Sequence, residues 1–290
     1  PLLDGRADVE GFSLKGARIN SKTIVPNLAV KGSIKSFVAE AKGADWEHSL
    51  FTLNRAHLDG AELSVALADT AQKDTTSQPV VWVVDAQDIQ IQRSKLLLTM
   101  PGDSLHLAAS LQDARMTKGH FDLGKKDFRV KSIVLSQGAA SMNMTRHLLP
   151  KDALFELSGI DCKASNINYD AAGRFMANLE HLSLREGQHD FYLTHLGGKI
   201  EGDTTWVSLP NLRVVTPNSQ LKASLTADFS AFQPTGKGRF SLKGQTSIGM
   251  VDVLAVLKPH VSATQYRQMA EMSWKLMGGN PIEMQVTAEG

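Results

Sequence analysis

Short runs in which apolar and polar residues alternate recur along most of the chain. In residues 221–229 the odd positions read Leu, Ala, Leu, Ala and Phe, whereas the even positions read Lys, Ser, Thr and Asp. Period-two alternation places every second side chain on the same face of a β-strand. The pattern therefore predicts strands that bury one face and expose the other to water.

Similar runs, separated by turn residues, predict strands from end to end of the sequence. Asp59-Gly60 separates two of them and is a dipeptide typical of tight hairpin turns. Pro217-Asn218 is expected to form another turn, and the polar segment 71–79 is expected to be a mobile loop. The predicted strands are 12–19, 50–58, 61–69, 80–92, 95–100, 104–114, 119–124, 128–137, 154–170, 174–186, 190–202, 205–216 and 221–229.

The strand runs resemble one another without a fixed period. "LSVALADT", "LHLAASLQDA" and "LKASLTADFS" share alternating Leu and Ala followed by an acidic residue. Repetition with irregular spacing favours one elongated antiparallel sheet over a compact sandwich. We expect one continuous elongated domain, with sheet blocks at 1–70 and 80–246, a helical segment at 247–280, and the start of a further strand at 281–290.

The last part of the chain changes to helical spacing. Residues 247–258 are apolar at positions 250, 251, 253, 254, 256 and 257, which predicts a short helix or a buried strand. Ser262 and Gln265 form a capping-box pattern for a second helix, which Gly278-Gly279 can end. This helix either covers the end of a sheet or gates a ligand as a plug. The candidate plug residues are Tyr266, Met269, Leu276 and Met277.

Composition narrows the possible functions. Aromatic residues make up only 6 % of the chain, so the interior must be mainly aliphatic. A net charge of +1 provides no strong field for nucleic acid, and we expect no nucleic-acid partner. The single cysteine, Cys162, excludes an internal disulfide. The chain starts "PLLDGRADVE" and ends "MQVTAEG", so we expect an internal fragment of a longer protein.

A search for catalytic and metal-binding patterns finds no candidate site. The nucleotide-binding, zinc-protease and nucleophile-elbow motifs are absent from the sequence. The glycine-containing segment 196–203 is expected to be a turn, because glycine clusters between strands usually are. His189 and His195 fall on one face of a strand but about 20 Å apart, too far for one ion.

The remaining reactive residues favour structural roles. Asp85 and Asp88 fall on opposite faces of a regular strand, which is unsuitable for a paired-carboxylate site. Cys162 has charged neighbours but no nearby histidine to activate it, so a structural thiol is expected. We therefore expect no enzyme, no cofactor, no metal and no catalytic residue.

Three longer segments carry a resemblance to a known family. They are "WVVDAQDIQIQRSKLLLTM" (82–100), "HFDLGKKDFRVKSIVLSQGAASM" (120–142) and "LPNLRVVTPNSQLKASLTADFSAF" (209–232). The chain resembles the TamB family, the translocation and assembly module subunits within the wider AsmA-like group, in its Bacteroidetes-type form. The resemblance covers most of residues 80–290, and its motifs are degenerate β patterns rather than a catalytic fingerprint.

The resemblance implies a long sheet curled into an open, taco-like groove with an aliphatic lining. Family members are anchored in the inner membrane of Gram-negative bacteria and cross the periplasm. They are associated with phospholipid movement to the outer membrane and with outer-membrane protein assembly. The implied partners are phospholipid acyl chains, an inner-membrane anchor and an outer-membrane barrel assembly protein, the last two reached through regions absent from this sequence.

The leading hypothesis is a non-enzymatic hydrophobic groove for phospholipid transfer. Acyl chains would cover the apolar face of a sheet that curls without closing. The alternative is a β-sandwich or solenoid that binds protein or glycan, and the same residues would also fit the dry core of a closed barrel. The predicted groove lining is Leu63, Val65, Leu67, Ile89, Ile91, Leu105, Leu107, Phe128, Val130, Leu221, Leu225 and Phe229.

Overall fold

The chain divides into two compact units, which we describe separately. The computed structural model describes residues 6–7, 10–25, 28–45, 48–67, 81–100, 105–144, 154–187, 191–232, 238–258, 261–277 and 280–290. Unit 1 comprises Pro1–Ile160 with Tyr169–Ala171, and unit 2 comprises Asp161–Asn168 with Ala172–Gly290.

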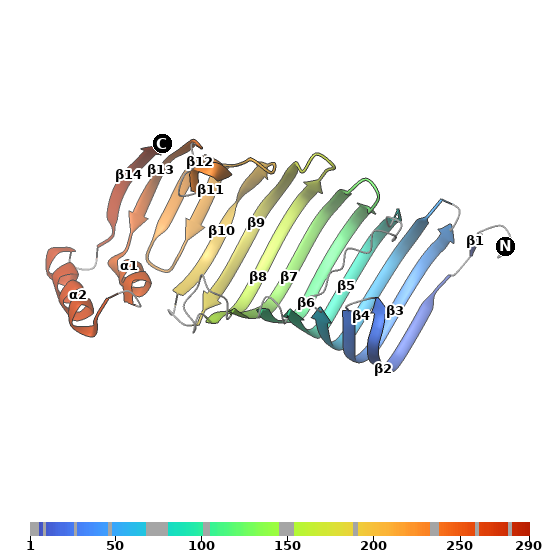
Figure 1. Ribbon diagram of the computed structural model, residues 1–290. Helices are drawn as coiled ribbons and strands as arrows, with labels where there is room; N and C mark the ends of the chain where they lie inside the picture. The colour runs from blue at the N-terminus through green and yellow to red at the C-terminus, as the bar shows by residue number, and fades with distance from the viewer. Residues whose placement is uncertain are drawn as a thin grey trace. The chain divides into compact units, whose positions relative to one another are not determined.

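Unit 1 is built from long strands that pair side by side (Figure 1). Strands β3 to β7 each contain 18 residues. The order is β1-β3-β4-β5-β6-β7-β8, and β2 pairs with β3. The bounds are β1 Arg6–Ala7, β2 Phe12–Val25, β3 Leu28–Asp45, β4 Leu50–Leu67, β5 Val83–Met100, β6 Leu105–Asp122, β7 Asp127–Met144 and β8 Leu154–Tyr169, which continues into unit 2.

The predicted hairpin at Asp59-Gly60 is wrong. Both residues lie inside β4, so the two predicted strands form one. The next pair, β4 with β5, is parallel, with Leu50 beside Val83 and Ala66 beside Thr99. A parallel pair requires the intervening chain to return to the other end of the strands. The predicted loop 71–79 lies outside the described residues.

Residues with positive φ form a row across unit 1, which we call the first bend line. The row contains Gly16 (φ 63°), Gly60 (φ 60°), Arg93 (φ 46°) and Gln137 (φ 52°). The pairing registers place these residues at one level of the sheet, opposite Lys35 in β3 and Gln112 in β6. A second bend line passes through Lys118 (φ 50°) and the register shift between Glu40 and Ala41.

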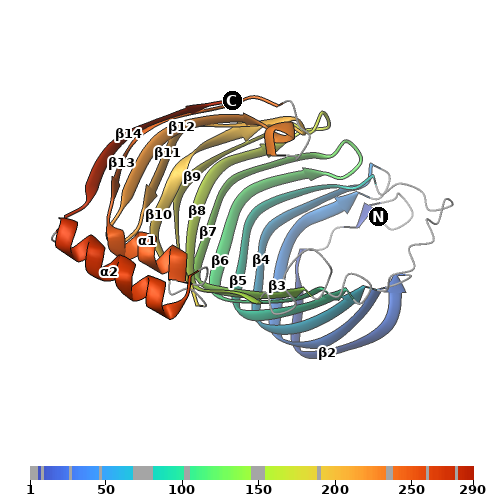
Figure 2. The same cartoon turned by 60° about the vertical axis from the view of Figure 1, so that its left-hand side comes forward.

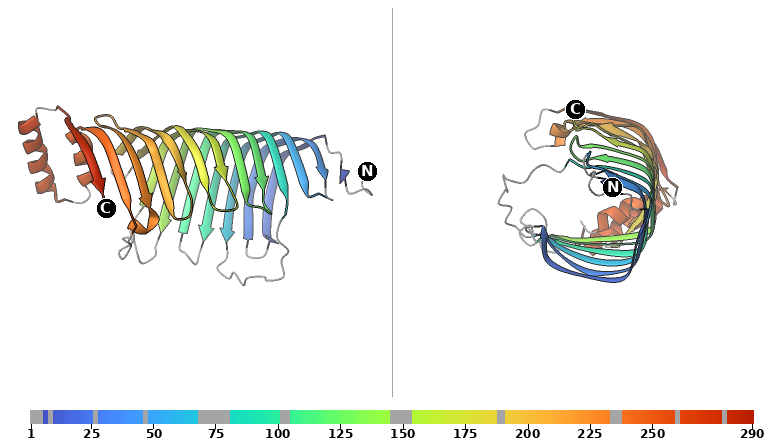
Figure 3. Two further views of the ribbon diagram at one scale, coloured as in Figure 1. Left: turned by 90° about the horizontal axis from the view of Figure 1, so that it is seen from above. Right: turned by 90° about the vertical axis from the view of Figure 1, so that its right-hand side faces the viewer.

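The bend lines change which residues face the apolar side. In β5, Ile89 and Ile91 are apolar at odd positions, whereas Leu96 and Leu98 are apolar at even positions, with Arg93 between them. One left-handed residue shifts the alternation by one position and turns the strand. The strands of unit 1 therefore continue past the predicted breaks at 93–94 and 115–118, and they curve so that one sheet face is concave (Figure 2; Figure 3, right).

Unit 2 has shorter strands, and its described pairs are antiparallel. Two predictions are wrong here. Gly197 and Gly198 lie inside β10 rather than in a turn, and Phe229 begins a 3-10 helix after β12 ends at Asp228. The bounds are β9 Phe175–Glu186, β10 Phe191–Gly202, β11 Trp206–Val215, β12 Gln220–Asp228, η3 Phe229–Phe232, β13 Phe240–Ile248, α1 Met250–Leu257, α2 Ala263–Met277 and β14 Ile282–Glu289.

The turn between β11 and β12 is present as predicted and holds helix α1. The Thr216 amide donates to the Ser219 carbonyl at 2.9 Å, which closes the turn around Pro217-Asn218. The Asp252 carboxylate accepts bonds from the Asn218 side chain at 2.9 Å, the Ser219 hydroxyl at 2.6 Å and the Thr216 hydroxyl. We call this arrangement the Asp252 clamp.

Helix α2 begins as its sequence predicts. The Gln265 amide donates to the Ser262 hydroxyl at 3.3 Å, and the Ser262 amide donates to the Gln265 side chain at 3.0 Å. These reciprocal bonds are the predicted capping box. Within the described residues, no helix has the length and apolar character needed to cross a bilayer.

The all-β, open-sheet fold with a short C-terminal helical segment is confirmed. The strand order is linear, and the sheet does not close into a barrel. Among the described residues no second sheet packs on either unit, so the sandwich alternative is wrong. No large side chain in the described part of the chain is fully buried, and most buried apolar residues are alanines. Each unit is therefore a single layer without a dry central core.

Candidate functional site

The concave side of unit 1 carries a continuous set of apolar side chains, which we call the unit 1 apolar face. Between the first bend line and the Leu67 end of β4, Leu63 lies beside Leu96, and Leu96 lies beside Ala109. The next row contains Val65, Leu98 and Leu107, followed by the pair of Met100 and Leu105. Because residues two apart share a face, these rows form one aliphatic surface.

The surface continues between the two bend lines. Ala56, Ile89, Met116 and Ile133 form one cross-strand row of β4 to β7. Leu58, Ile91, Ala114 and Leu135 form the next row. The first bend line shifts the alternation of each strand by one residue. The odd-numbered apolar residues of β5 before Arg93 and the even-numbered ones after it therefore lie on the same side of the sheet.

Beyond the second bend line the surface becomes partly aromatic. Phe51, Val84, Phe121 and Phe128 are neighbours across β4 to β7. The ring centroids of Phe121 and Phe128 are 6.3 Å apart, and those of Phe128 and Tyr169 are 5.9 Å apart. These separations are typical of favourable aromatic pairs. The unit 1 apolar face therefore ends in a row that contains several aromatic side chains.

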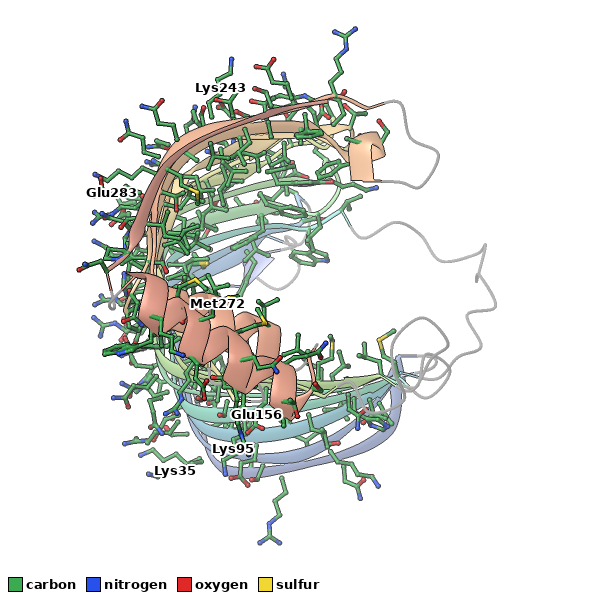
Figure 4. The ribbon with its side chains drawn as sticks, turned by 90° about the vertical axis from the view of Figure 1, so that its left-hand side faces the viewer. Lys35, Lys95, Glu156, Lys243, Met272 and Glu283 are labelled. Atoms are coloured by element: carbon green, nitrogen blue, oxygen red, sulfur yellow. The ribbon has the colours of Figure 1, made fainter. Side chains whose placement is uncertain are left out.

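The opposite face of unit 1 is polar and convex. Lys35 points away from the concave side (Figure 4). Asp59 is buried beneath this face and pairs with Arg93 at 2.6 Å and Lys35 at 3.6 Å. The hydrogen bond from Arg93 is the main reason that the pKa of Asp59 lies below its usual value. Polar side chains of these strands thus pair with one another on the convex face, whereas the concave face is apolar.

More cross-strand pairs complete the convex face. Gln92 donates to Asp113 at 2.8 Å, and Arg115 binds Asp88 through two nitrogens at 2.8 Å and 2.7 Å. The hydrogen bond from Arg115 lowers the pKa of Asp88. Asp85 lies 2.7 Å from His120 on the same face. The expectation that Asp85 and Asp88 face opposite sides is wrong, because the second bend line passes between them.

Among the described residues of unit 1, no protein layer covers the unit 1 apolar face. Strands of unit 1 contact their sheet neighbours, and no described helix of that unit crosses the concave side. Its large side chains are half-buried by their neighbours in the sheet, and 40 % of Leu96 is exposed. Contiguous apolar surfaces of this kind are common at interaction sites of proteins, so this face is the candidate site.

Unit 1 also contains an open hollow of about 590 Å³ whose lining comes from both faces of the sheet. The charged pair Glu62–Lys95 and the short side chains of Ala108, Ser110 and Ser141 line it together with Leu63, Leu96 and Ala109 of the unit 1 apolar face. Because the rows of apolar side chains extend beyond this hollow, we place the candidate site on the concave side of unit 1.

The predicted lining residues are distributed over both units. Leu221 and Leu225 share the apolar face of unit 2 with the buried Ala223 and Ala227. The side chain of Leu67 lies outside the described residues, and Phe229 follows the strand rather than belonging to it. The predicted residues on the unit 1 apolar face are Leu63, Val65, Ile89, Ile91, Leu105, Leu107, Phe128 and Val130.

Sequence reasoning missed strand β3 and the aromatic row. Phe37 of β3 lies beside Leu58 of β4. The ring centroids of Phe37 and Phe12 are 6.1 Å apart. Phe51 and Phe121 open two predicted strands with the same F-x-L pattern. That shared opening could have indicated one level of the sheet, because equivalent positions in repeated strands align.

The helices of unit 2 expose apolar side chains. Tyr266 and Met269 are half-buried, whereas the side chains of Leu276 and Met277 lie outside the described residues. Met272 is 59 % exposed and Trp274 is 71 % exposed. A hollow of about 390 Å³ separates α1 from α2, with Leu254, Ala270 and Trp274 in its lining. The plug remains a prediction for these residues.

The reactive residues form no larger cluster. Over the described ranges, no group of three or more His, Cys, Asp or Glu is arranged to hold a metal ion. Cys162 is half-buried, and burial raises the pKa of its thiol. His189 lies outside the described residues, but His195 has a cross-strand neighbour in His181.

Comparison with known proteins gives no assignment. No family model matches this chain, and no curated protein matches it either. Any function of this chain is therefore inferred from its residues and from the geometry of its sheet.

Proposed function

We propose that this chain is a non-enzymatic segment of a TamB/AsmA-like protein of the Gram-negative periplasm. Its apolar faces would hold phospholipid acyl chains during transfer between the inner and outer membranes and so support outer-membrane assembly. The observation that carries the proposal is the unit 1 apolar face, which is concave and contiguous and which no other described residues of that unit cover.

Acyl chains fit this surface physically. Covering apolar area releases about 25 cal/mol per Å², or about 0.8 kcal/mol for each buried methylene group. Rows of Leu, Ile, Val and Ala offer similar contacts at each successive strand, so a chain can move between rows without losing a specific anchor. The charged headgroup stays in water because a charge is costly to bury.

The test measures which face of the sheet contacts lipid. A photoreactive residue replaces Leu107 on the unit 1 apolar face. The matched position on the convex face is His106, the residue before Leu107 in β6. Leu225 and Ser224 form a second pair in β12. Vesicles of phosphatidylethanolamine and phosphatidylglycerol are the lipid source.

We expect lipid adducts at positions 107 and 225 and few at positions 106 and 224, measured by mass spectrometry of the irradiated protein. Equal labelling within both pairs would show that the apolar faces do not select acyl chains. Protein adducts in place of lipid adducts would favour the adhesion alternative.

A further inference from the structure

Two histidines of unit 2 face each other across neighbouring strands. His181 lies in β9 and His195 lies in β10. Their Nδ1 atoms are 3.1 Å apart, and their ring centroids are 5.3 Å apart. Both rings are partly buried, and the function proposed above uses neither of them.

A local irregularity of β10 brings the pair together. The β9–β10 register shifts between Leu193 and Leu196, so Thr194 and His195 together lie opposite the single residue Ser183 and β10 contains one extra residue. Gly197 leaves room for the ring, because a Cβ atom there would lie 2.8 Å from His195 Nε2. The strand thus places the imidazole of His195 over its own backbone and toward His181.

A second polar group orients His181. The hydroxyl of Ser183, which is only 8 % exposed, lies 3.3 Å from His181 Nε2. A proton on Nε2 can be donated to this hydroxyl, which leaves the Nδ1 lone pair of His181 directed at His195. Such a hydrogen bond on the second ring nitrogen is typical of histidines that bind metals.

We propose that His181 and His195 form a two-histidine site for a divalent transition metal of the Cu²⁺, Ni²⁺ or Zn²⁺ class. Two nitrogens at about 2.0–2.1 Å from one ion lie about 2.9–3.4 Å apart for bond angles between about 90° and about 109°. The observed nitrogen separation of 3.1 Å falls in this range. The ion takes the place of the proton between the rings, which turn slightly so that both lone pairs meet it.

The proton balance of binding is simple. His195 moves its remaining proton from Nδ1 to Nε2, so both ligands bind as neutral imidazoles and no net proton is released. Burial, with His181 and Arg213, lowers the pKa of His195. Water molecules would fill the other coordination positions of the ion.

The residues around His181 and His195 predict how substitutions would change the affinity of the site for a metal ion. Arg213 places a positive charge near His195, which opposes a cation, so Arg213→Gln should tighten metal binding. Ser183→Ala removes the group that orients His181 and should weaken binding about tenfold, as loss of such partners does in other sites. A bound ion would also link β9 to β10 and stabilise unit 2 by mass action.

The experiment titrates the metal-free full chain with Cu²⁺ alone at pH 7.5. Electron paramagnetic resonance reports nitrogen ligands, and thermal unfolding reports stabilisation. We expect nitrogen hyperfine structure from two imidazoles and a raised unfolding midpoint, both lost in His181→Ala and in His195→Ala. His57→Ala is the matched control, because His57 bonds Gln92 in unit 1 and its cross-strand neighbours are Val38 and Gln90.

The proposal is wrong if Cu²⁺ binds equally to wild type, His181→Ala and His195→Ala, or if two-imidazole hyperfine structure is absent from the wild type. Circular dichroism checks that each variant folds. If an alanine variant does not fold, Ser183→Ala and Arg213→Gln decide the question, and unchanged Cu²⁺ affinity in both would refute the site.

Discussion

Single residues in the left-handed conformation determine the shape of unit 1. Gly60 and Arg93 occupy neighbouring positions of the first bend line, and each shifts the apolar alternation of its strand by one residue. A non-glycine residue with this backbone conformation is strained. The neighbouring cross-strand pairs of the convex face, such as Arg93 with Asp59, offset that strain.

Replacing Gly60 by alanine should destabilise the protein. The new Cβ atom would lie 2.9 Å from the Cβ atom of Lys35, and φ is positive at this position. Gly16→Ala is the matched control, because Gly16 has positive φ in the same row but nothing within 4 Å. We expect a loss of about 1–3 kcal/mol for Gly60→Ala and a smaller loss for Gly16→Ala, measured by urea unfolding. Equal losses would show that the contact with Lys35 is unimportant.

The carboxylate of Asp59 should make stability depend on pH. Its pKa is lower in the folded protein than in the unfolded chain, mainly because of the hydrogen bond from Arg93. A lowered pKa stabilises the fold above the unfolded value, and this stabilisation is lost as the pH falls through the folded value. Asp59→Asn should therefore destabilise the protein at pH 7 and reduce the loss of stability on acidification from pH 5 to pH 2. Parallel pH profiles for the variant and the wild type would contradict this assignment.

At the level of elements, helix α1 depends on the turn that the sequence places before β12. The helix has 8 residues, which is too short to be stable alone, and its N-cap residue Gly249 has no side chain. Burial opposes ionisation of Asp252, but hydrogen bonds from Asn218, Ser219 and Thr216 outweigh it and lower the pKa of Asp252. The geometry of the Asp252 clamp within unit 2 thus depends on one carboxylate.

Removing that carboxylate should loosen α1. Asp252→Ala leaves the donors of the turn without their acceptor, and we expect a loss of about 1–3 kcal/mol. Amide hydrogen exchange should become faster in α1 while the amides of β12 and β13 remain protected. Glu271→Ala on the exposed side of α2 is the control and should leave exchange in α1 unchanged. Unchanged exchange in Asp252→Ala would mean that other contacts hold the helix.

The whole molecule is organised as single sheet layers with chemically different faces. Because no large side chain of the described residues is fully buried, stability is spread over many half-buried contacts and backbone ladders. Such a layer tolerates a polar replacement on an uncovered face better than a closed core would, since the new side chain can reach water.

An arginine on the unit 1 apolar face should impair lipid contact and spare the fold. Leu107→Arg places a charge among Val65, Leu98 and Met142, where an acyl chain would lose its apolar contact. We expect a severalfold reduction in binding of an apolar fluorescent probe and an unchanged far-ultraviolet circular dichroism spectrum. His106→Arg on the convex face should retain wild-type probe binding. If both variants bind the probe as the wild type does, this face is not the binding surface.

The sequence by itself determined most of the strands, their faces and the helix that starts after Ser262, because alternation, capping and turn chemistry act between residues close in the chain. The runs at Leu221–Leu225 and Ile89–Ile91 already identified apolar faces, and Ser262 with Gln265 identified the start of α2. What the sequence pattern could not distinguish was a turn from a bend, since both interrupt the alternation. The hairpin predicted at Asp59-Gly60 was wrong for this reason.

Only the tertiary structure decided which strands pair and how they align. The parallel pair β4–β5, the bend lines, and the facing of His181 and His195 all depend on register between strands distant in sequence. Register is set by the simultaneous fit of whole strands, and one local irregularity changes every later side chain of a strand. The local pattern therefore predicted the apolar faces, whereas their concave shape and, within the described ranges, the lack of a covering layer depend on long-range pairing.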